Sequence, residues 1–215
     1  MTNVEPGRTT VYVDGLNLYY GVLHGKPNRR WLDPEKMARE VLPTAEIDKV
    51  KFFTARMKDF GRSGAHQRQD VYLRALLTTG VVEIHYGHFR VDPRTRKLVT
   101  PLPDGTRFVE VLSPEEKGSD VNLASHLVLD GALGRYDTAL VVTNDSDLAE
   151  PIRLTTSELG KNVVLLHPSG GPAGSLVKAG PSAILKLQVN TILKCQLPDP
   201  VIDAKGRAIS KPAGW

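Results

Sequence analysis

Acidic residues stand at three widely separated places in the chain, each beside a segment with the pattern of a strand end or a helix start. The first place holds Asp14, the second Asp120, and the third Asp145 and Asp147. In a parallel α/β sheet the carboxyl ends of the strands share one edge, where ligands bind. Carboxylates that meet there raise one another's pKa unless a cation neutralises them. Oxygen ligands suit Mg²⁺ or Mn²⁺, so the sequence predicts a metal site for phosphate chemistry.

The first two acidic positions also have an ordinary structural interpretation. Asp14 precedes Gly15, whose missing Cβ permits a sharp exit from the strand, and Asn17 follows about one helical turn later. Either Asp14 or Asn17 could simply cap the next helix. Asp120 belongs to the first turn of a predicted helix, where the helix dipole favours an acidic residue. Lys117, three residues earlier, could neutralise a phosphate or lie in solvent.

The third acidic position gives the strongest signal, because Asp145 and Asp147 follow an apolar strand directly. Residues two apart in an extended chain point to the same side, so both carboxylates could face one ion. Asn144 and Ser146 add hydrogen-bonding groups at a helix N-terminus, a position that favours anions. One of these four residues must cap the helix, so we expect at least one of them to be structural.

Basic residues are concentrated in one part of the chain, with seven Lys or Arg between residues 49 and 74. Much of this excess falls on a predicted loop, residues 56–64, that follows a strand and therefore shares the edge of the acidic residues. Arg56, Arg62 and Arg68 could hold a nucleic-acid backbone there, or they could form an ordinary solvated surface. The net charge of +4 and the pI near 9.2 permit a nucleic-acid partner without requiring one.

Composition limits the class of protein. The chain has 215 residues, of which 40% are hydrophobic and 24% charged, as in ordinary globular proteins. Its single cysteine, Cys195, cannot form an internal disulfide and fits a reducing compartment. We find no apolar stretch of signal-peptide length at the start and no apolar run near the roughly 20 residues that span a bilayer. We therefore expect a cytoplasmic protein without a membrane partner.

Apolar runs rich in β-branched residues alternate with helical periodicity, which predicts a parallel sheet with crossover helices. The expected strands are residues 9–13, 50–54, 81–86, 138–143 and 162–166. The expected helices are residues 16–23, 34–42, 66–79, 119–133, 147–159 and 187–195. Residues 87–112 look like an inserted antiparallel excursion, broken at Asp92-Pro93 and turning at residues 103–106. We expect one domain over residues 1–197 and a polar tail over 198–215, whose Trp215 could dock on a partner or on the domain.

Three motifs together resemble the signature blocks of NYN domains, relatives of the PIN-domain nucleases. They are Val13-Asp14-Gly15-Leu16-Asn17, then Glu116-Lys117-Gly118-Ser119-Asp120-Val121-Asn122, then Thr143-Asn144-Asp145-Ser146-Asp147-Leu148. The resemblance implies a Rossmann-like, PIN-like α/β sheet flanked by helices and a Mg²⁺- or Mn²⁺-dependent ribonuclease. It maps the metal ligands onto Asp14, Asp120, Asp145 and Asp147, with Asn17 and Lys117 as supporting residues.

Two positions depart from the family pattern. Many NYN domains carry an acidic residue six positions after the Asp120 equivalent, where this chain has His126. The usual Ser-Gly before the last acidic pair is Thr143-Asn144 here. The first departure removes a possible ligand and leaves open whether one or two metals bind and whether catalysis survives.

The leading hypothesis is a metal-dependent RNA endonuclease, and the rival is a non-catalytic RNA-binding adaptor that keeps the fold. A phosphatase of the haloacid-dehalogenase type is disfavoured because Leu16 occupies the place of its second Asp. A dinucleotide-binding oxidoreductase is disfavoured because no Gly-x-Gly-x-x-Gly follows the first strand. The oligomeric state stays open, and a homo-oligomer is possible.

Overall fold

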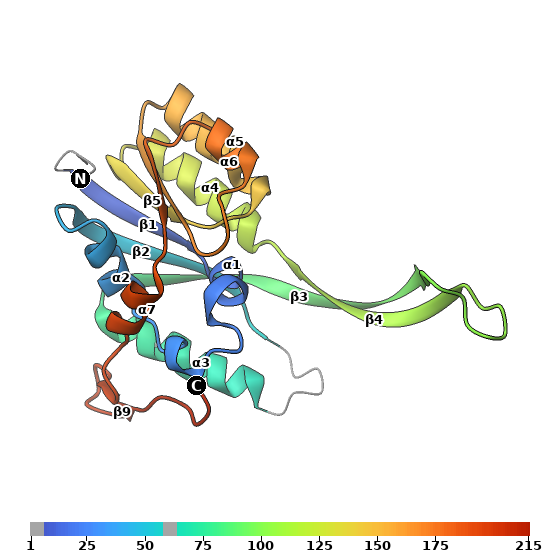
Figure 1. Ribbon diagram of the computed structural model, residues 1–215. Coiled ribbons are helices and arrows are strands. Elements are labelled where there is room, and N and C mark those ends of the chain that lie inside the picture. The colour runs from blue at the N-terminus through green and yellow to red at the C-terminus, as the bar shows by residue number, and fades with distance from the viewer. Residues whose placement is uncertain (1–6, 58–63) are drawn as a thin grey trace.

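A seven-stranded sheet forms the centre of the molecule, with strand order β4-β3-β2-β1-β5-β6-β7 (Figure 1). The computed structural model describes residues 7–57 and 64–215. The strands of this sheet are β1 (Arg8–Asp14), β2 (Glu46–Ala55), β3 (Val82–Lys97), β4 (Phe108–Lys117), β5 (Thr138–Val142), β6 (Asn162–His167) and β7 (Ala183–Lys186). Neighbouring strands are parallel except β3 and β4, which are antiparallel. The predicted α/β fold with a mainly parallel sheet is confirmed.

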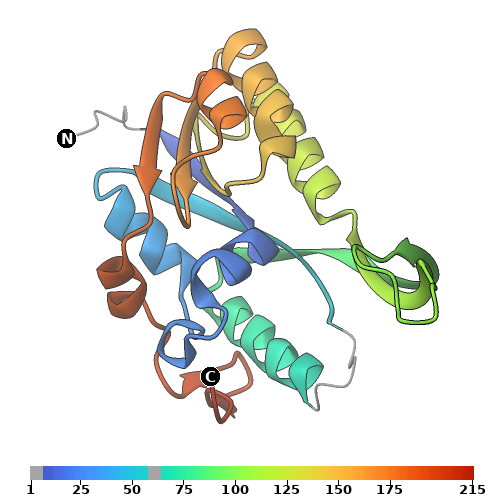
Figure 2. The same ribbon diagram turned by 45° about the vertical axis from the view of Figure 1, so that its right-hand side comes forward.

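Helices cover both faces of the sheet (Figures 1 and 2). The α-helices are α1 (Gly15–Leu18), α2 (Pro34–Val41), α3 (Ala65–Leu76), α4 (Ser119–Ala132), α5 (Ala149–Arg153), α6 (Gly174–Lys178) and α7 (Val189–Lys194). Short 3₁₀ or π turns are η1 (Tyr19–Leu23), η2 (Pro27–Arg29), η3 (Leu77–Thr79), η4 (Ser146–Leu148) and η5 (Leu154–Glu158). No helix in the described part of the chain is both long and apolar enough to cross a membrane.

Alternation along the strands divides the hydrophobic core into two layers. In β1, Val11 and Val13 join the core on the side of α1, α2 and α3, whereas Tyr12 joins the core beneath α4 and α5. The same alternation recurs in β5 and β6, where every residue from Ala139 to Val142 and from Val163 to Leu166 is buried. Strands buried on both faces read as continuous apolar runs, which is why the sequence identified them.

Local signals also place the helix ends. The side chain of Asp33 accepts hydrogen bonds from the backbone N–H groups of Glu35 and Lys36 and so caps α2, with Pro34 at its first position. Gly80 and Gly160 end two helical segments with positive φ, the conformation that glycine adopts most readily. These helix boundaries agree with the predicted ones within a few residues.

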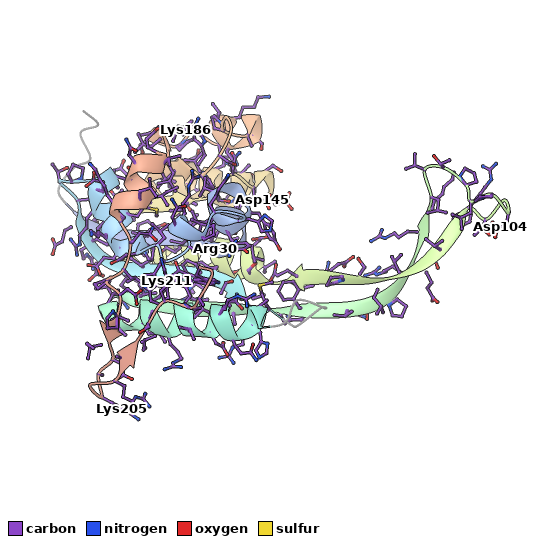
Figure 3. All side chains as sticks on the ribbon, turned by 60° about the horizontal axis from the view of Figure 1, so that its bottom comes forward. Arg30, Asp104, Asp145, Lys186, Lys205 and Lys211 are labelled. Atoms are coloured by element: carbon purple, nitrogen blue, oxygen red, sulfur yellow. The ribbon has the colours of Figure 1, made fainter. Side chains whose placement is uncertain are left out.

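The inserted excursion is a two-stranded arm that extends away from the body of the molecule, with Asp104 near its tip (Figure 3). β3 and β4 pair continuously from His88–Lys117 to Lys97–Phe108. The predicted break at Asp92-Pro93 is therefore wrong, since Pro93 lies within β3 opposite Leu112. Beyond Gly87, β3 has no pairing with β2, and proline is tolerated on such an edge because no neighbour needs its missing N–H.

The C-terminal part of the chain holds elements that the sequence did not indicate. α6 and the edge strand β7 fall in a stretch with no predicted element, and β8 (Val201–Ile202) pairs with β9 (Ala208–Ile209) in the presumed polar tail. Val201 and Ile209 are buried in the main core, and the Trp215 ring lies 5.2 Å from that of Tyr72. The end of the chain thus packs on the domain itself.

Candidate metal site

The structure brings together one aspartate from each of the three acidic positions. Asp14 is the last residue of β1, Asp120 lies in the first turn of α4, and Asp145 follows β5. One carboxylate oxygen of each lies within 4.8 Å of the others. The meeting follows from topology, because β1 and β5 are parallel neighbours and α4 begins at the same edge of the sheet. Asp145 is labelled in Figure 3.

Asp14 is the buried member of this group, with 3% of its surface exposed. Its Oδ1 accepts a hydrogen bond from the Asn17 backbone N–H at 2.9 Å, and its Oδ2 accepts one from Thr143 Oγ1 at 2.9 Å. Burial raises the pKa of Asp14 to about 7; the Asn17 hydrogen bond opposes this shift and the charge of Asp120 adds to it. A cation bound nearby would favour the ionised form of this carboxyl and lower its pKa.

Gly15 is required for close packing and not for an unusual backbone angle. A Cβ at this position would lie 2.6 Å from Phe52 Cε1 and 2.7 Å from the Phe53 carbonyl oxygen. Glycine therefore lets α1 start directly against β2. The φ of Gly15 is not positive. The sequence analysis expected glycine to allow a sharp turn out of the strand, but here it allows the backbone to pack closely against β2.

Asp120 is held at the edge of the sheet by the short connection between β4, the second strand of the arm, and α4. Gly118 has a φ of +94°, and the backbone N–H of Ser119 donates to Glu116 Oε1 at 3.0 Å. A Cβ on Gly87 would lie 2.6 Å from the Lys117 carbonyl oxygen and 2.8 Å from the Ser119 backbone nitrogen. Burial raises the pKa of Asp120, and the charge of Asp145 raises it further.

Asp145 and Asp147 do not act as an equivalent pair. The backbone N–H of Asp147 donates to Asp145 Oδ1 at 3.0 Å, so Asp145 caps η4, and the backbone N–H of Asp145 donates to Thr143 Oγ1 at 3.0 Å. The side chain of Asp147 is exposed and lies outside the group of three. The chain turns into η4 after Asp145 and does not stay extended, so the two-residue alternation expected of an extended chain does not apply to this pair.

Two asparagines connect the segments that carry the aspartates. Asn17 Oδ1 accepts a hydrogen bond from the Asn144 backbone N–H at 3.0 Å and so joins the first motif to the third. The Asn144 side chain binds the following loop, accepting from the Ala173 backbone N–H at 2.9 Å and donating to the Gly171 carbonyl at 3.1 Å. Both side chains position the site. Ser146 is exposed in η4.

The basic residues predicted to bind substrate do not gather at one place, unlike the aspartates. Lys117 Nζ lies 3.2 Å from Glu115 Oε2, and the Arg56 guanidinium lies 4.9 Å from the centroid of the Tyr86 ring. Arg68 lines a second cavity, described below. Arg62 lies outside the described residues.

The carboxylates line an open cavity of about 400 Å³. The described residues of its wall include no Lys, Arg or His, so none of them supplies the positive charge that three adjacent carboxylates need. Oxygen donors from Asp, with Asn and Ser beside them, form the set that hard divalent cations such as Mg²⁺ and Mn²⁺ prefer. The donor set therefore fits the metal that the family implies.

His126 has a different role from the acidic residue of many family members. It does not belong to the carboxylate group; its Nδ1 lies 3.2 Å from Lys51 Nζ, which forms a buried ion pair with Asp130 Oδ2 at 2.5 Å. Tyr12 also donates to Asp130 Oδ2, at 2.8 Å. His126 is therefore part of a polar network between the sheet and α4.

A second cavity, of about 240 Å³, lies beside the first. Leu16 and Tyr20 line both cavities. Its aromatic lining residues come from η1 and the residue after it, from β2, α3 and β3, and from the chain end; they are Tyr19, Tyr20, His24, Phe52, Tyr72, Phe89 and Trp215. The sequence analysis missed this aromatic cavity, because no spacing pattern relates residue 19 to residue 215.

A family model of the NYN domain matches residues 8–186, and the chain belongs to this family. The resemblance stated from the three motifs is thus confirmed. NYN domains form a PIN-like nuclease family, and the aspartate group of this chain lies where its motifs converge.

Two individual proteins are similar over most of the chain. 6-Hydroxy-3-succinoylpyridine 3-monooxygenase HspA of Pseudomonas putida (strain DSM 28022 / S16) is 31% identical over 240 residues, which cover 98% of this chain and 76% of that protein. The crystal structure of VPA0982 from Vibrio parahaemolyticus RIMD 2210633, a protein of unknown function, matches with a TM-score of 0.55 and 14% identity, over 88% of this chain and 98% of that one. At this identity the second match shows the fold alone.

Proposed function

We propose that this chain is a Mg²⁺- or Mn²⁺-dependent endoribonuclease that hydrolyses RNA phosphodiester bonds at the aspartate group. The observation that carries the proposal is the meeting of Asp14, Asp120 and Asp145 in one cavity whose described wall has no basic side chain. Membership of the NYN family supports phosphodiester hydrolysis as the class of reaction.

In this proposal Asp14, Asp120 and Asp145 hold the ion. A divalent ion bound there lowers the pKa of a bound water and polarises the scissile phosphate. The chain contributes a fixed set of carboxylates: Asn17 and Thr143 orient Asp14 by hydrogen bonds, and the cap of η4 orients Asp145. No nucleophilic side chain is required. Asp147 stays a predicted ligand from the exposed rim of the site.

The RNA backbone would pass along the edge of the sheet beside the aspartates. Arg56, Arg68 and Lys117 would offset phosphate charge, and Arg62 stays a prediction. Ser146, exposed next to Asp145, could donate a hydrogen bond to a phosphate oxygen. Asn144 would act through its contacts with residues 17, 171 and 173 and would hold the edge in shape.

Cleavage of end-labelled single-stranded RNA by the full chain tests the proposal. We expect cleavage with Mn²⁺ or Mg²⁺, none with a chelator, and a rate lower by at least about 100-fold for Asp14→Asn and Asp145→Asn. Asp48→Asn is the matched control, because Asp48 is exposed near the start of β2, whereas the aspartate group lies at the edge where the parallel strands end. Equal cleavage by wild type and the two site variants would mean contamination and would refute the proposal. The same assay with labelled single-stranded DNA decides whether the substrate is RNA or DNA.

The non-catalytic adaptor predicts RNA binding with a steep salt dependence but without metal-dependent turnover. Calorimetric titration with Mn²⁺ separates the two, because an adaptor has no need of the ion. Binding of Mn²⁺ to wild type but not to Asp145→Asn supports the enzyme. RNA binding without any Mn²⁺ binding supports the adaptor.

A second candidate function is hydroxylation of a substituted pyridine. It is favoured by the name of the Pseudomonas relative and by the aromatic cavity that adjoins the aspartate group. Incubation with 6-hydroxy-3-succinoylpyridine, a reduced nicotinamide and dioxygen tests it by oxygen uptake and by the mass of the product. Oxygen uptake that yields a ring product with a new hydroxyl at carbon 3 in place of the succinoyl group, together with the released four-carbon side chain, would support this function over the nuclease.

A further inference from the structure

The aromatic cavity has the lining of a site for flat ring compounds. The ring centroids of Tyr19 and Tyr20 in η1 lie 5.2 Å apart, and those of Tyr20 and His24, the residue after η1, lie 5.7 Å apart. The Trp215 ring lies 5.2 Å from the Tyr72 ring. Aromatic pairs at such distances favour stacked or edge-on packing. A planar ring that enters the cavity would meet aromatic surfaces from η1 and from the chain end.

The size of the cavity limits the occupant to one ring system. Its volume of about 240 Å³ is below the roughly 300–1,000 Å³ of pockets that hold drug-sized ligands. It is also far larger than the share of one water molecule in the liquid, about 30 Å³. Protein interiors contain few voids larger than a water molecule. A cavity of this size among aromatic side chains is therefore suited to a bound ring.

Polar groups in the wall add recognition of a charged or hydrogen-bonding ligand. Arg30 and Arg68 line the cavity, together with Thr54 and Gln69. The Arg30 side chain is fixed by hydrogen bonds from Nε to the Leu23 carbonyl and from Nη1 to the Gly214 carbonyl, each 3.4 Å long. A guanidinium group stacks on rings and binds carboxylate or phosphate oxygens. This wall matches a heteroaromatic ring with hydrogen-bonding groups better than it matches a hydrocarbon.

The two cavities share a wall that joins the ring site to the aspartate group. Leu16 and Tyr20, one helical turn apart, line both cavities, and Tyr20 is 63% exposed. Gly15, which lines the aromatic cavity, directly follows Asp14. A substituent on a ring in the aromatic cavity can therefore extend past Tyr20 to the aspartates.

We propose that the aromatic cavity binds a single planar heteroaromatic ring and directs the anionic group attached to that ring towards the aspartate site. Two sources share this chemistry: the base of a nucleotide, whose phosphate is the anionic group, and a small free ring acid such as a hydroxypyridine carboxylate. Ring binding does not depend on phosphodiester hydrolysis, so it extends beyond the proposed function and is tested separately from it.

The test is calorimetric titration of the full chain, in the presence of Mn²⁺, with adenosine and uridine monophosphates in one arm and 6-hydroxynicotinate in the other. Ala65→Phe narrows the cavity, because Ala65 lines it from the first turn of α3. Tyr20→Ala removes an exposed ring from its wall. The matched control is Ala132→Phe, which makes the same change at an exposed residue at the end of α4.

We expect saturable one-to-one binding in at least one arm, at least about tenfold weaker in Ala65→Phe and Tyr20→Ala and unchanged in Ala132→Phe. The arm that binds identifies the source of the ring. Binding in neither arm, or equal binding by wild type and both cavity variants, overturns the proposal. Asp145→Asn separates the two ideas: it should lower RNA cleavage at least about 100-fold and, where the nucleotides bind wild type, it should still bind uncharged adenosine or uridine in the cavity.

Discussion

The raised pKa of Asp14 makes the stability of the metal-free protein depend on pH. Burial raises this pKa from an ordinary value of 3.8 to about 7 in the folded chain. A carboxyl with a higher pKa in the folded state binds its proton more tightly there. The stability it contributes is therefore fully present below pH 3.8 and is lost as the pH rises to about 7.

The size of this loss follows from the shift. Each unit of difference in pKa corresponds to about 1.36 kcal/mol, so the whole shift corresponds to about 4 kcal/mol. About 3 kcal/mol of it falls between about pH 5 and about pH 8. Asp14→Asn removes the titrating group, and its amide oxygen can still accept from the Asn17 backbone N–H while Thr143 Oγ1 can accept from its NH₂ group.

Urea denaturation with a chelator present, at these two pH values, measures the effect. Wild type should lose about 3 kcal/mol more free energy of unfolding than Asp14→Asn on going to the higher pH. Titrating groups distant from the site contribute equally to both proteins, so the difference reports Asp14 together with its coupling to Asp120 and Asp145. Asp48→Asn should behave as wild type. The same pH dependence in wild type and Asp14→Asn would refute the assignment of a proton-binding carboxyl to the centre of the site.

Three further outcomes are expected. Saturating Mn²⁺, at about 100 times its Kd, should stabilise wild type by about 2.7 kcal/mol and raise its melting temperature by roughly 5–10 °C; scanning calorimetry should show no such rise for Asp145→Asn. Lys51→Met should lower the free energy of unfolding in urea by about 3 kcal/mol, because it leaves the buried carboxylate of Asp130 without its closest cation, and a loss below about 1 kcal/mol would contradict this. Asp33→Ala removes the cap of α2 and should cost about 1 kcal/mol in the same assay, whereas no loss would mean that water replaces the cap.

The convergence of the aspartates could be predicted from the sequence because it depends on topology alone. Parallel strands deliver their carboxyl ends to one edge whatever their side chains do, so Asp14 and Asp145 could be expected at the same edge once their strands were identified. That β1 and β5 are adjacent in the sheet is shown by the structure. The pairing of Asn17 with Asn144 and the bridging role of Thr143 depend on positions within a few tenths of an ångström between segments more than 120 residues apart. No sequence period encodes such contacts.

The elements that the sequence missed are short or lie at an edge. β7 has four residues, none of them fully buried, so it lacks the long apolar run that identified β5 and β6. The tail looks polar because its few buried side chains, among them Val201 and Ile209, are separated by turns. The aromatic cavity escapes detection for a related reason, since its wall is assembled from residues of several segments that lie far apart in the sequence.

The base of the arm and the aspartate site form one connected structure. β4 ends at Lys117, opposite His88, and α4 begins at Ser119, so Asp120 takes its place from the point where the arm rejoins the body. Gly87 lies too close to the Lys117 carbonyl to carry a side chain, and a shift there would move the first turn of α4. Asp14 and Asp145, by contrast, are fixed by adjacent strands of the central sheet. One of the three carboxylates is therefore held by a different part of the fold from the other two.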